Sequence, residues 1–135
     1  NESDMKGQQA IGDILEKLGQ SDEIDTNEII NNDLIPTLQM DKKGTITHVN
    51  SLLTDVLGYK PESILKKSIA DILMIEPNTE QAKFLEKIQN YEIIDSSLPF
   101  KNQKGEKELY RAFTLPVFGE DKKETKMIMF LANFA

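Results

Sequence analysis

The sequence predicts an α+β domain: a five-stranded antiparallel sheet with short helices on one face and an amphipathic N-terminal helix capping the other. Three observations favour this fold. Strand-like runs bounded by glycine-containing turns lie at both ends of residues 34–135, and helix-like spacing fills the stretch between them. The last strand is apolar on both faces, so both faces of the sheet need a cover. A chain of 135 residues suits one domain with a sizeable core.

Two strands open the body of the domain. Residues 34–40 and 45–50 read as strands, and Gly44 stands in the turn between them, where an unusual backbone conformation is needed. The alternation of apolar and polar residues stops at Asn50, whose side chain can cap the free N–H groups of a following helix. We therefore expect a hairpin that leads directly into a helix.

Several short helical segments come next. Residues 51–57 form the first, with Gly58 as its stop, and residues 61–67 and 68–73 supply two more. The longest helix of the body is predicted for residues 76–90, with Asn78 as its N-cap.

The chain then returns to strands. Residues 93–102, 108–118 and 125–134 are predicted strands, separated by polar turns that each contain a glycine. The two early strands and the three late ones have to pair in one sheet, with the helices packed on one face.

The last strand carries the strongest signal for a buried sheet. One of its faces carries Ile128, Phe130, Ala132 and Phe134, and the other carries Met127, Met129 and Leu131. A half-solvated antiparallel strand would alternate apolar with polar residues. We assign Ile128 and Phe130 to the interior beneath the helices, and the two methionines with Leu131 to the opposite face.

The N-terminal segment offers a cover for that opposite face. It carries an apolar stripe at helical spacing, formed by Ile11, Ile14, Leu15 and Leu18. So short a helix is not stable alone and needs a surface to lie on, in its own chain or in a dimer partner. Burying the four side chains at about 1.5–3 kcal/mol each, before ordering costs, would hold the helix but leave it switchable. A static cap is the alternative.

Charge and composition divide the chain into parts. We expect a leader at residues 1–9 that is disordered or was added for expression, an acidic helical cap or linker at 10–33, and the folded domain at 34–135. Residues 1–34 carry nine acidic and two basic side chains, so the net charge of −7 lies there and residues 35–135 are neutral. An acidic leader on a neutral body argues against binding to a phosphate backbone, which needs clustered Lys and Arg, so nucleic acid is not an expected partner. No apolar run approaches the ~20 residues that span a bilayer, so we expect no membrane insertion.

A series of short motifs resembles the PAS domain family over residues 34–134. No motif is specific alone, but they come in the family's order: Asp41, Gly44, Ile46, Val49 and Asn50, then Leu57-Gly58-Tyr59, Pro61-Glu62, the turn Asn102–Gly105, and Leu115-Pro116-Val117. Two positions depart from the pattern. Lys60 stands where a capping Ser or Thr often precedes the Pro-Glu pair, and Lys67 stands where a glycine often ends the helix.

The resemblance implies a sensory or dimerising module of a larger signalling protein. We expect a cytoplasmic module that relays ligand binding or partner state through sheet and dimer packing, with a homodimer, the protein's other domains and a small-molecule ligand as partners. The alternative is a ligand-free dimerisation or protein-interaction module. Apolar pattern alone selects the interior ligand-binding candidates: Leu38, Ile46, Leu53, Ile72, Phe84, Leu85, Phe113, Leu115, Ile128 and Phe130. The expected interface or cap residues are Ile11, Ile14, Leu15, Leu18, Met127, Met129 and Leu131.

The sequence contains few of the residue types that cofactor chemistry or catalysis would need. The chain has no cysteine, which removes the thiolate–flavin photochemistry of light-sensing PAS relatives. Haem-binding relatives imply a histidine on or near residues 78–90, whereas the single histidine, His48, lies in a predicted strand, where we interpret it as an ordinary strand residue. Non-covalent flavin stays open, and the cofactor is unknown. One histidine cannot build a catalytic triad or a His-carboxylate metal cluster, so we expect no enzyme activity in these residues.

Overall fold

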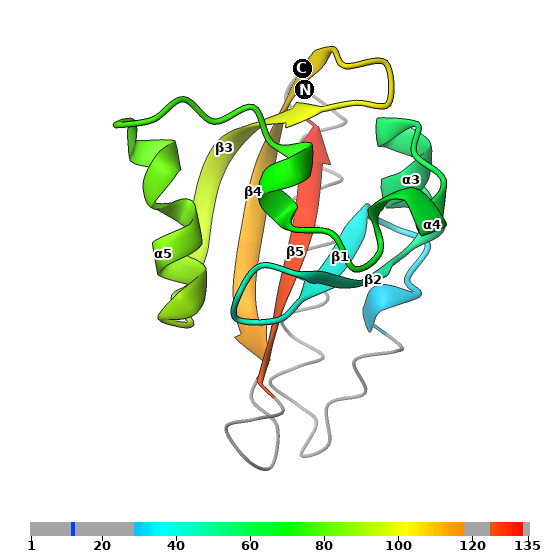
Figure 1. The fold of residues 1–135 in the computed structure, drawn as a ribbon. Coiled ribbons are helices and arrows are strands. Elements are labelled where there is room, and N and C mark those ends of the chain that lie inside the picture. Colours follow the sequence, from blue (N-terminus) through cyan, green and yellow to red (C-terminus); the bar gives the residue numbers. More distant parts are fainter. Residues whose placement is uncertain (1–11, 13–28, 118–124, 134–135) are drawn as a thin grey trace.

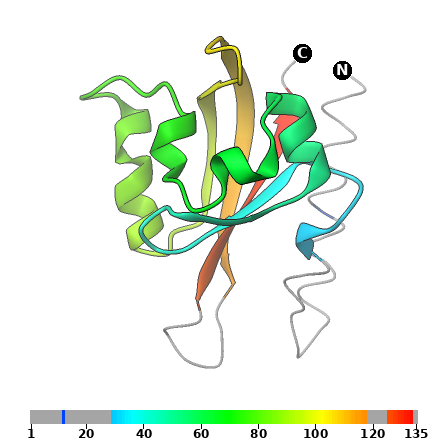
Figure 2. The same ribbon diagram turned by 45° about the vertical axis from the view of Figure 1, so that its right-hand side comes forward.

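The computed structural model describes residues 12, 29–117 and 125–133 of the chain. Its sheet contains five antiparallel strands in the order β2-β1-β5-β4-β3. All the labelled helices lie on one face of this sheet (Figure 1, Figure 2). The predicted sheet and its one-sided helical layer are therefore confirmed, whereas the expected cap at residues 10–18 lies outside the described residues apart from Gly12.

The elements follow the predicted order along the chain. The strands are β1 (Thr37–Met40), β2 (Ile46–Val49), β3 (Ile94–Lys101), β4 (Lys107–Val117) and β5 (Lys126–Asn133). The helical segments are α3 (Ser51–Leu57), α4 (Pro61–Ile64), the 3₁₀ turns η1 (Ile69–Ile72) and η2 (Glu80–Lys83), and α5 (Phe84–Gln89). Within the described parts of the chain, no helix combines the length and apolar character needed to cross a membrane.

Side chains and glycines set the boundaries of α3. The Asn50 Oδ1 atom accepts a hydrogen bond from Leu53 N at 3.0 Å, which satisfies a free N–H group of the first turn. Gly58 ends the helix at φ 79°, a left-handed conformation that glycine adopts without a steric penalty, and its N–H donates to Thr54 O at 2.8 Å. Both predicted ends of this helix are confirmed.

The predicted long helix at residues 76–90 is divided and shorter. Asn78 takes φ 65°, which is incompatible with a helical residue or an N-cap, so the prediction of its capping role was wrong. Thr79 takes that role, since its Oγ1 accepts from Ala82 N at 3.3 Å. The left-handed residue near the end of α4 is Lys66, at φ 70°, rather than the Lys67 that the family pattern indicated.

Two apolar clusters lie on opposite faces of the sheet. The inner cluster fills the space between sheet and helices; its buried members are Leu38, Met40, Ile46, Leu53, Leu57, Ile64, Ile69, Ile72, Leu73, Phe84, Ile88, Ile94, Leu98, Phe100, Ala112, Met127, Met129 and Leu131. The outer cluster comprises Ile35, Leu115, Val117, Ile128 and Phe130, with Ile29 and Phe113 partly buried against it. Both faces of β5 are buried, as its apolar sequence predicts.

The two faces of β5 are the reverse of the predicted assignment. Met129 pairs directly with Leu38 of β1, and residues paired directly across antiparallel strands share a face. Leu38 packs beneath the helices, so Met127, Met129 and Leu131 belong to the inner cluster rather than to an outer interface. A strand that is apolar on both sides gives no internal signal for which side faces inward, and only its register with β1 decides.

The same register corrects four interior candidates. Phe113 and Leu115 of β4 pair with Phe130 and Ile128 of β5, and all four lie on the outer face, not beneath the helices. The remaining candidates keep their predicted position: Leu38, Ile46, Leu53, Ile72 and Phe84 are in the inner cluster, and Leu85 is partly buried against it. Ile11, Ile14, Leu15 and Leu18 lie outside the described residues.

Candidate functional site

The space between sheet and helices is occupied by the domain's own side chains. Phe84 is 2% exposed, and Phe100, Met127 and Met129 are fully buried. Phe100 also makes an edge-to-face contact with Tyr110, with ring centroids 5.9 Å apart. Binding a large planar cofactor here would require these side chains to repack.

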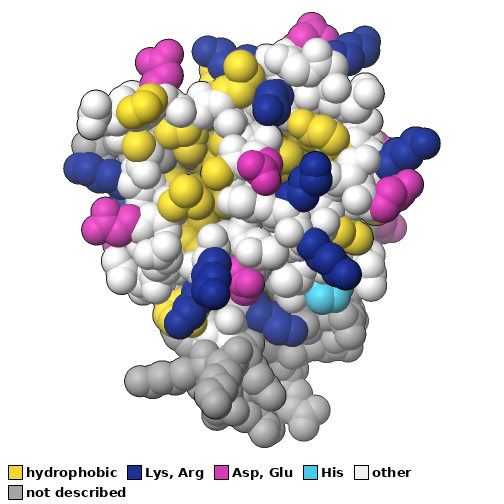
Figure 3. All heavy atoms as spheres, in the orientation of Figure 1, with side chains coloured by type: hydrophobic (Ala, Val, Ile, Leu, Met, Phe, Trp, Pro, Cys, Tyr) yellow, Lys and Arg dark blue, Asp and Glu magenta, His cyan; other side chains and the backbone are white. Residues whose placement is uncertain are grey.

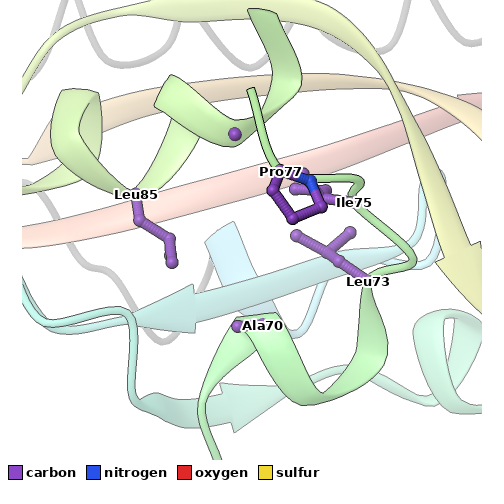
Figure 4. Close-up of a pocket in the computed structure, with 6 residues that line it drawn as sticks. Ala70, Leu73, Ile75, Pro77 and Leu85 are labelled. Carbon is purple, nitrogen blue, oxygen red and sulfur yellow. The ribbon is translucent and has the colours of Figure 1, made fainter. Parts of the chain in front are cut away.

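A small pocket opens on the helix-covered face, between η1 and α5 (Figure 4). Its volume is about 230 Å³. This is below the ~300 Å³ of the smallest typical drug-sized sites. Hydrophobic side chains gather on this face over the same segments (Figure 3). The pocket is lined by Ala70, Leu73, Ile75, Pro77, Ala82 and Leu85.

The pocket wall is tied to the sheet through the segment that follows η1. Leu73 forms an isolated β-bridge with Phe100 of β3, and Met74 N donates to Pro99 O at 2.8 Å. A displacement of this wall would therefore act on the edge strand β3. All six lining side chains are apolar, so the pocket fits a small uncharged apolar molecule and offers no side-chain anchor for a charged one.

One predicted interior candidate, Leu85, lines this pocket. The other lining residues escaped sequence reasoning because the candidates were chosen by apolar pattern alone, and that pattern does not show where packing leaves space. Two of the missed residues, Ala70 and Ala82, create the space through their small side chains, whereas Pro77 contributes a wall from an irregular connection. A pair of alanines at helical positions among larger apolar residues was the available signal, but alanine is too common to be decisive.

Asn50 secures the corner where β2 meets α3. Besides capping the helix, its Oδ1 accepts from Thr37 N at 3.0 Å, and its Nδ2 donates to Asn32 O at 3.2 Å and Ile35 O at 2.9 Å. The side chain is 5% exposed, so these partners replace water for both polar atoms. The predicted structural role of Asn50 is confirmed, and it extends to the segment that enters β1.

Asn32 continues this network toward the N-terminal side. Its Oδ1 accepts from Leu34 N at 3.0 Å and Ile35 N at 2.9 Å, and its Nδ2 donates to Ile29 O and to Thr37 Oγ1. Two asparagines therefore fix the chain between residue 29 and β1. The direction in which the N-terminal segment meets the domain depends on the same network that caps α3.

Tyr59 connects the far end of α3 to the β3–β4 hairpin. Its hydroxyl donates to the main-chain oxygens of Lys101 and Asn102, and Gln103 N donates to Leu57 O at 2.9 Å. Burial raises the pKa of the Tyr59 hydroxyl above its usual value. The aromatic residue after Gly58 thus fastens the hairpin to the helix.

The outer face carries polar groups beside its apolar cluster. The Gln39 side chain is 1% exposed, and its Nε2 lies 3.0 Å from Thr47 Oγ1 and 3.1 Å from His48 Nδ1. Arg111 binds Asp95 through two hydrogen bonds, of 2.8 and 2.6 Å. These bonds to the guanidinium hold the pKa of the Asp95 carboxyl below its usual value.

His48 is an exposed residue of the edge strand β2. Across the described residues, no three His, Cys, Asp or Glu side chains come together in a way that could hold a metal ion. The position fits the interpretation of His48 as an ordinary strand residue that contacts Gln39.

Solved structures share this arrangement of strands and helices. The PAS domain of an HTR-like protein from Haloarcula marismortui has a TM-score of 0.63 and 16% identity, and the similarity covers 94% of this chain and 99% of that one. The chain has the PAS fold. The Rhodobacter sphaeroides LOV protein is similar at a TM-score of 0.69 and 13% identity over 79% of this chain, which spans 64% of the LOV protein. No family model and no curated protein matches the sequence.

A third solved structure with this fold is the PAS domain of a two-component sensor histidine kinase. It has a TM-score of 0.62 and 17% identity over 81% of this chain and 93% of its own. At such identities the similarity concerns the PAS fold itself. The pocket and polar networks described above are therefore interpreted from this chain's own residues.

Proposed function

We propose that this PAS-fold domain is a cytoplasmic sensory or regulatory module of a larger signal-transduction protein. The observation that carries the proposal is the apolar pocket of about 230 Å³, whose wall is bonded to an edge strand of the sheet. Solved structures with the same fold include a PAS domain from a sensor histidine kinase. A cysteine-free sequence fits a reducing compartment.

The ligand that suits the pocket is a small uncharged apolar molecule. It would bind between η1 and α5 and favour the arrangement of these segments that leaves the pocket open. A ligand shifts a conformational equilibrium only by its difference in affinity for the two states. In this proposal that difference comes from apolar contacts of the ligand with Leu73, Ile75 and Leu85, which line the open pocket.

Filling the pocket tests the ligand site. Ala70 is exposed at the pocket rim, so Ala70→Leu adds three carbon atoms there without entering the inner cluster. We expect native mass spectrometry of the protein to show a small bound molecule that Ala70→Leu displaces, with the melting temperature unchanged. Ser63→Leu, on the exposed face of α4, is the control for an added surface leucine. Protein that carries no bound molecule and binds no small apolar probe would favour the ligand-free interaction module.

The output of the module is proposed to pass through the outer face of the sheet. We infer that the stripe of residues 10–18 packs on the outer cluster, in the same chain or across a homodimer. Ile29 packs against that cluster, so the chain arrives at the domain on this face. Gly12, the described residue of the segment, is helical and exposed, as expected for a position beside the stripe.

A charge placed in the stripe tests the cover. Ile14→Asp puts a carboxylate into an apolar contact, and we expect faster amide exchange over residues 10–18, a lower melting temperature and weaker dimers in sedimentation. Gln9→Asp adds the same charge on the side opposite the stripe at helical spacing and should change none of these. If Ile14→Asp sediments, melts and exchanges as the parent does, the covering role is wrong.

A further inference from the structure

A buried amide oxygen interrupts the outer face of the sheet. Gln39 lies in the middle of β1, between Leu38 and Met40, whose side chains face the helices. Because side chains alternate along a strand, the Gln39 side chain lies on the outer face. It pairs with Ile128 of β5, a member of the outer cluster, and with His48 of β2. The side chain is 1% exposed, so this amide is part of the buried outer face and not of its rim.

The orientation of the Gln39 amide is fixed by its nitrogen. Nε2 bonds to Thr47 Oγ1 at 3.0 Å and lies 3.1 Å from His48 Nδ1, while the Thr47 hydroxyl donates to the main-chain oxygen of Gln39. The amide is planar, so fixing its nitrogen also fixes its oxygen. Within the part of the chain that the structure describes, Oε1 has no hydrogen-bond partner although it is buried.

An acceptor in this position is costly unless something donates to it. A buried polar atom without a partner loses its hydration and gains nothing in return, and an apolar β-branched residue would suit this strand position better. Thr47 and His48 lie on the β2 side of the amide, whereas on the β5 side the surface is apolar and belongs to the cluster of Ile35, Ile128 and Phe130. The structure therefore presents an apolar surface with one fixed acceptor, which suits an apolar occupant that carries a donor.

The chain's own N-terminal segment fits this description. Ile29 already packs on the outer cluster, and the chain before it continues for 28 residues. Residues 10–18 carry the apolar stripe, and polar donors stand next to it in the sequence, among them Gln8, Lys17 and Gln20.

We propose that residues 10–18 dock on the outer cluster and that a donor in or next to this segment binds Gln39 Oε1, so that Gln39 sets the register of docking. This inference rests on the covering role proposed above. Apolar contacts are non-directional and would allow a short helix to slide by one turn. A buried acceptor that is satisfied in one register alone disfavours the others, as buried polar groups do in coiled coils.

The test replaces the acceptor in the 135-residue chain. Gln39→Met keeps a similar shape without the amide, and amide hydrogen exchange of residues 10–18 is the measurement. We expect protection of this segment to fall on the order of tenfold, which is the loss of about one good hydrogen bond. Protection of β4 and β5 should stay unchanged, because the side-chain contacts that the variant removes within the sheet, those with Thr47 and His48, lie between β1 and β2.

Thr114→Val is the matched control. Thr114 Oγ1 is also buried and without a hydrogen-bond partner among the described residues. Thr114 lies on the inner face, because it pairs with Ile94 of β3 and Met129 of β5, which both belong to the inner cluster. Removing this hydroxyl should leave the exchange of residues 10–18 as it is. An equal effect of both variants would show a general change in the sheet and would overturn the proposal.

Three further outcomes separate this inference from the function on which it rests. If Ile14→Asp exposes residues 10–18 but Gln39→Met does not, the cover stands and the role of Gln39 is wrong. If neither variant changes the protection, the covering function itself fails. If Gln39→Met weakens sedimenting dimers while residues 10–18 keep their protection, a second copy occupies the acceptor and the proposal is overturned.

Discussion

Single side chains fix the corners of this domain. Asn50 Oδ1 accepts hydrogen bonds from the N–H groups of Leu53 and Thr37, and Asn50 Nδ2 donates to the main-chain oxygens of Asn32 and Ile35. One side-chain amide therefore joins α3, β1 and the segment that precedes β1. Because all these groups are buried or nearly so, water cannot replace the lost partners. The corner is therefore a point where a small change has a large energetic effect.

Asn50→Ala should lower the free energy of unfolding by about 2–4 kcal/mol, since it removes a helix cap and leaves buried backbone groups unpaired. Asn102 offers a matched comparison, because its Oδ1 also accepts from two backbone N–H groups, those of Lys104 and Glu106, in an exposed turn. Asn102→Ala should cost less than about 1 kcal/mol, since water can reach the freed groups. Urea denaturation of both variants measures the difference, and equal losses would contradict the role of burial.

At the scale of elements, β3 and β4 are joined by an ion pair on the outer face. Asp95 and Arg111 stand on the two neighbouring strands and form a bidentate contact. Both side chains are about a third exposed or more, at 33% for Arg111 and 40% for Asp95, so screening by solvent keeps the contribution small. The pair adds to the pairing of these strands without deciding the fold.

The lowered pKa of Asp95 gives this pair a pH dependence with a definite sign. A carboxyl whose pKa is lower in the folded state stabilises the fold above its unfolded pKa, and this contribution is lost as pH falls through the folded pKa. Asp95→Asn should cost at most about 1 kcal/mol at neutral pH, and the difference should shrink below about pH 4. Thermal melts across pH measure it.

Removal of the partner controls for other effects of the substitution. Arg111→Gln should reproduce the loss, and the double variant should add little to either single one, because both changes break the same contact. A difference between Asp95→Asn and the parent that stays constant down to the lowest pH would contradict the assignment.

The whole molecule combines an acidic N-terminal part with a neutral domain. The net charge of −7 lies within residues 1–34, and residues 35–135 sum to zero. Little net attraction therefore draws the two parts together, although local charges such as Arg111 are present. If residues 10–18 lie on the outer cluster, as proposed, the contact has to come from apolar burial and hydrogen bonding.

If apolar burial and hydrogen bonding hold residues 10–18 on the outer cluster, this contact should be insensitive to salt. Raising the ionic strength from about 0.05 to about 0.5 M screens charges strongly but does not weaken apolar contacts. Amide exchange over residues 10–18 should therefore be the same at both concentrations. Protection that falls as salt is added would indicate that electrostatic attraction holds the segment.

The sequence by itself determined the local structure of this protein. The strand hairpin at Gly44, the cap at Asn50, the stop at Gly58 and the two-sided burial of β5 depend on residues close together in the chain, whose conformational preferences are readable from their identity. The five-stranded sheet with helices on one face followed from the order of these elements.

Only the tertiary structure decided which side of each strand faces inward and where space remains. Met129 is inner and Phe130 outer because β5 pairs with β1, a strand far away in the sequence, and a shift by one residue would exchange them. The pocket beside Leu85 and the unpaired oxygen of Gln39 likewise depend on how distant segments meet. Side-chain packing and the pairing of buried polar atoms depend on contacts between segments far apart in the sequence, so they cannot be predicted from a local sequence pattern.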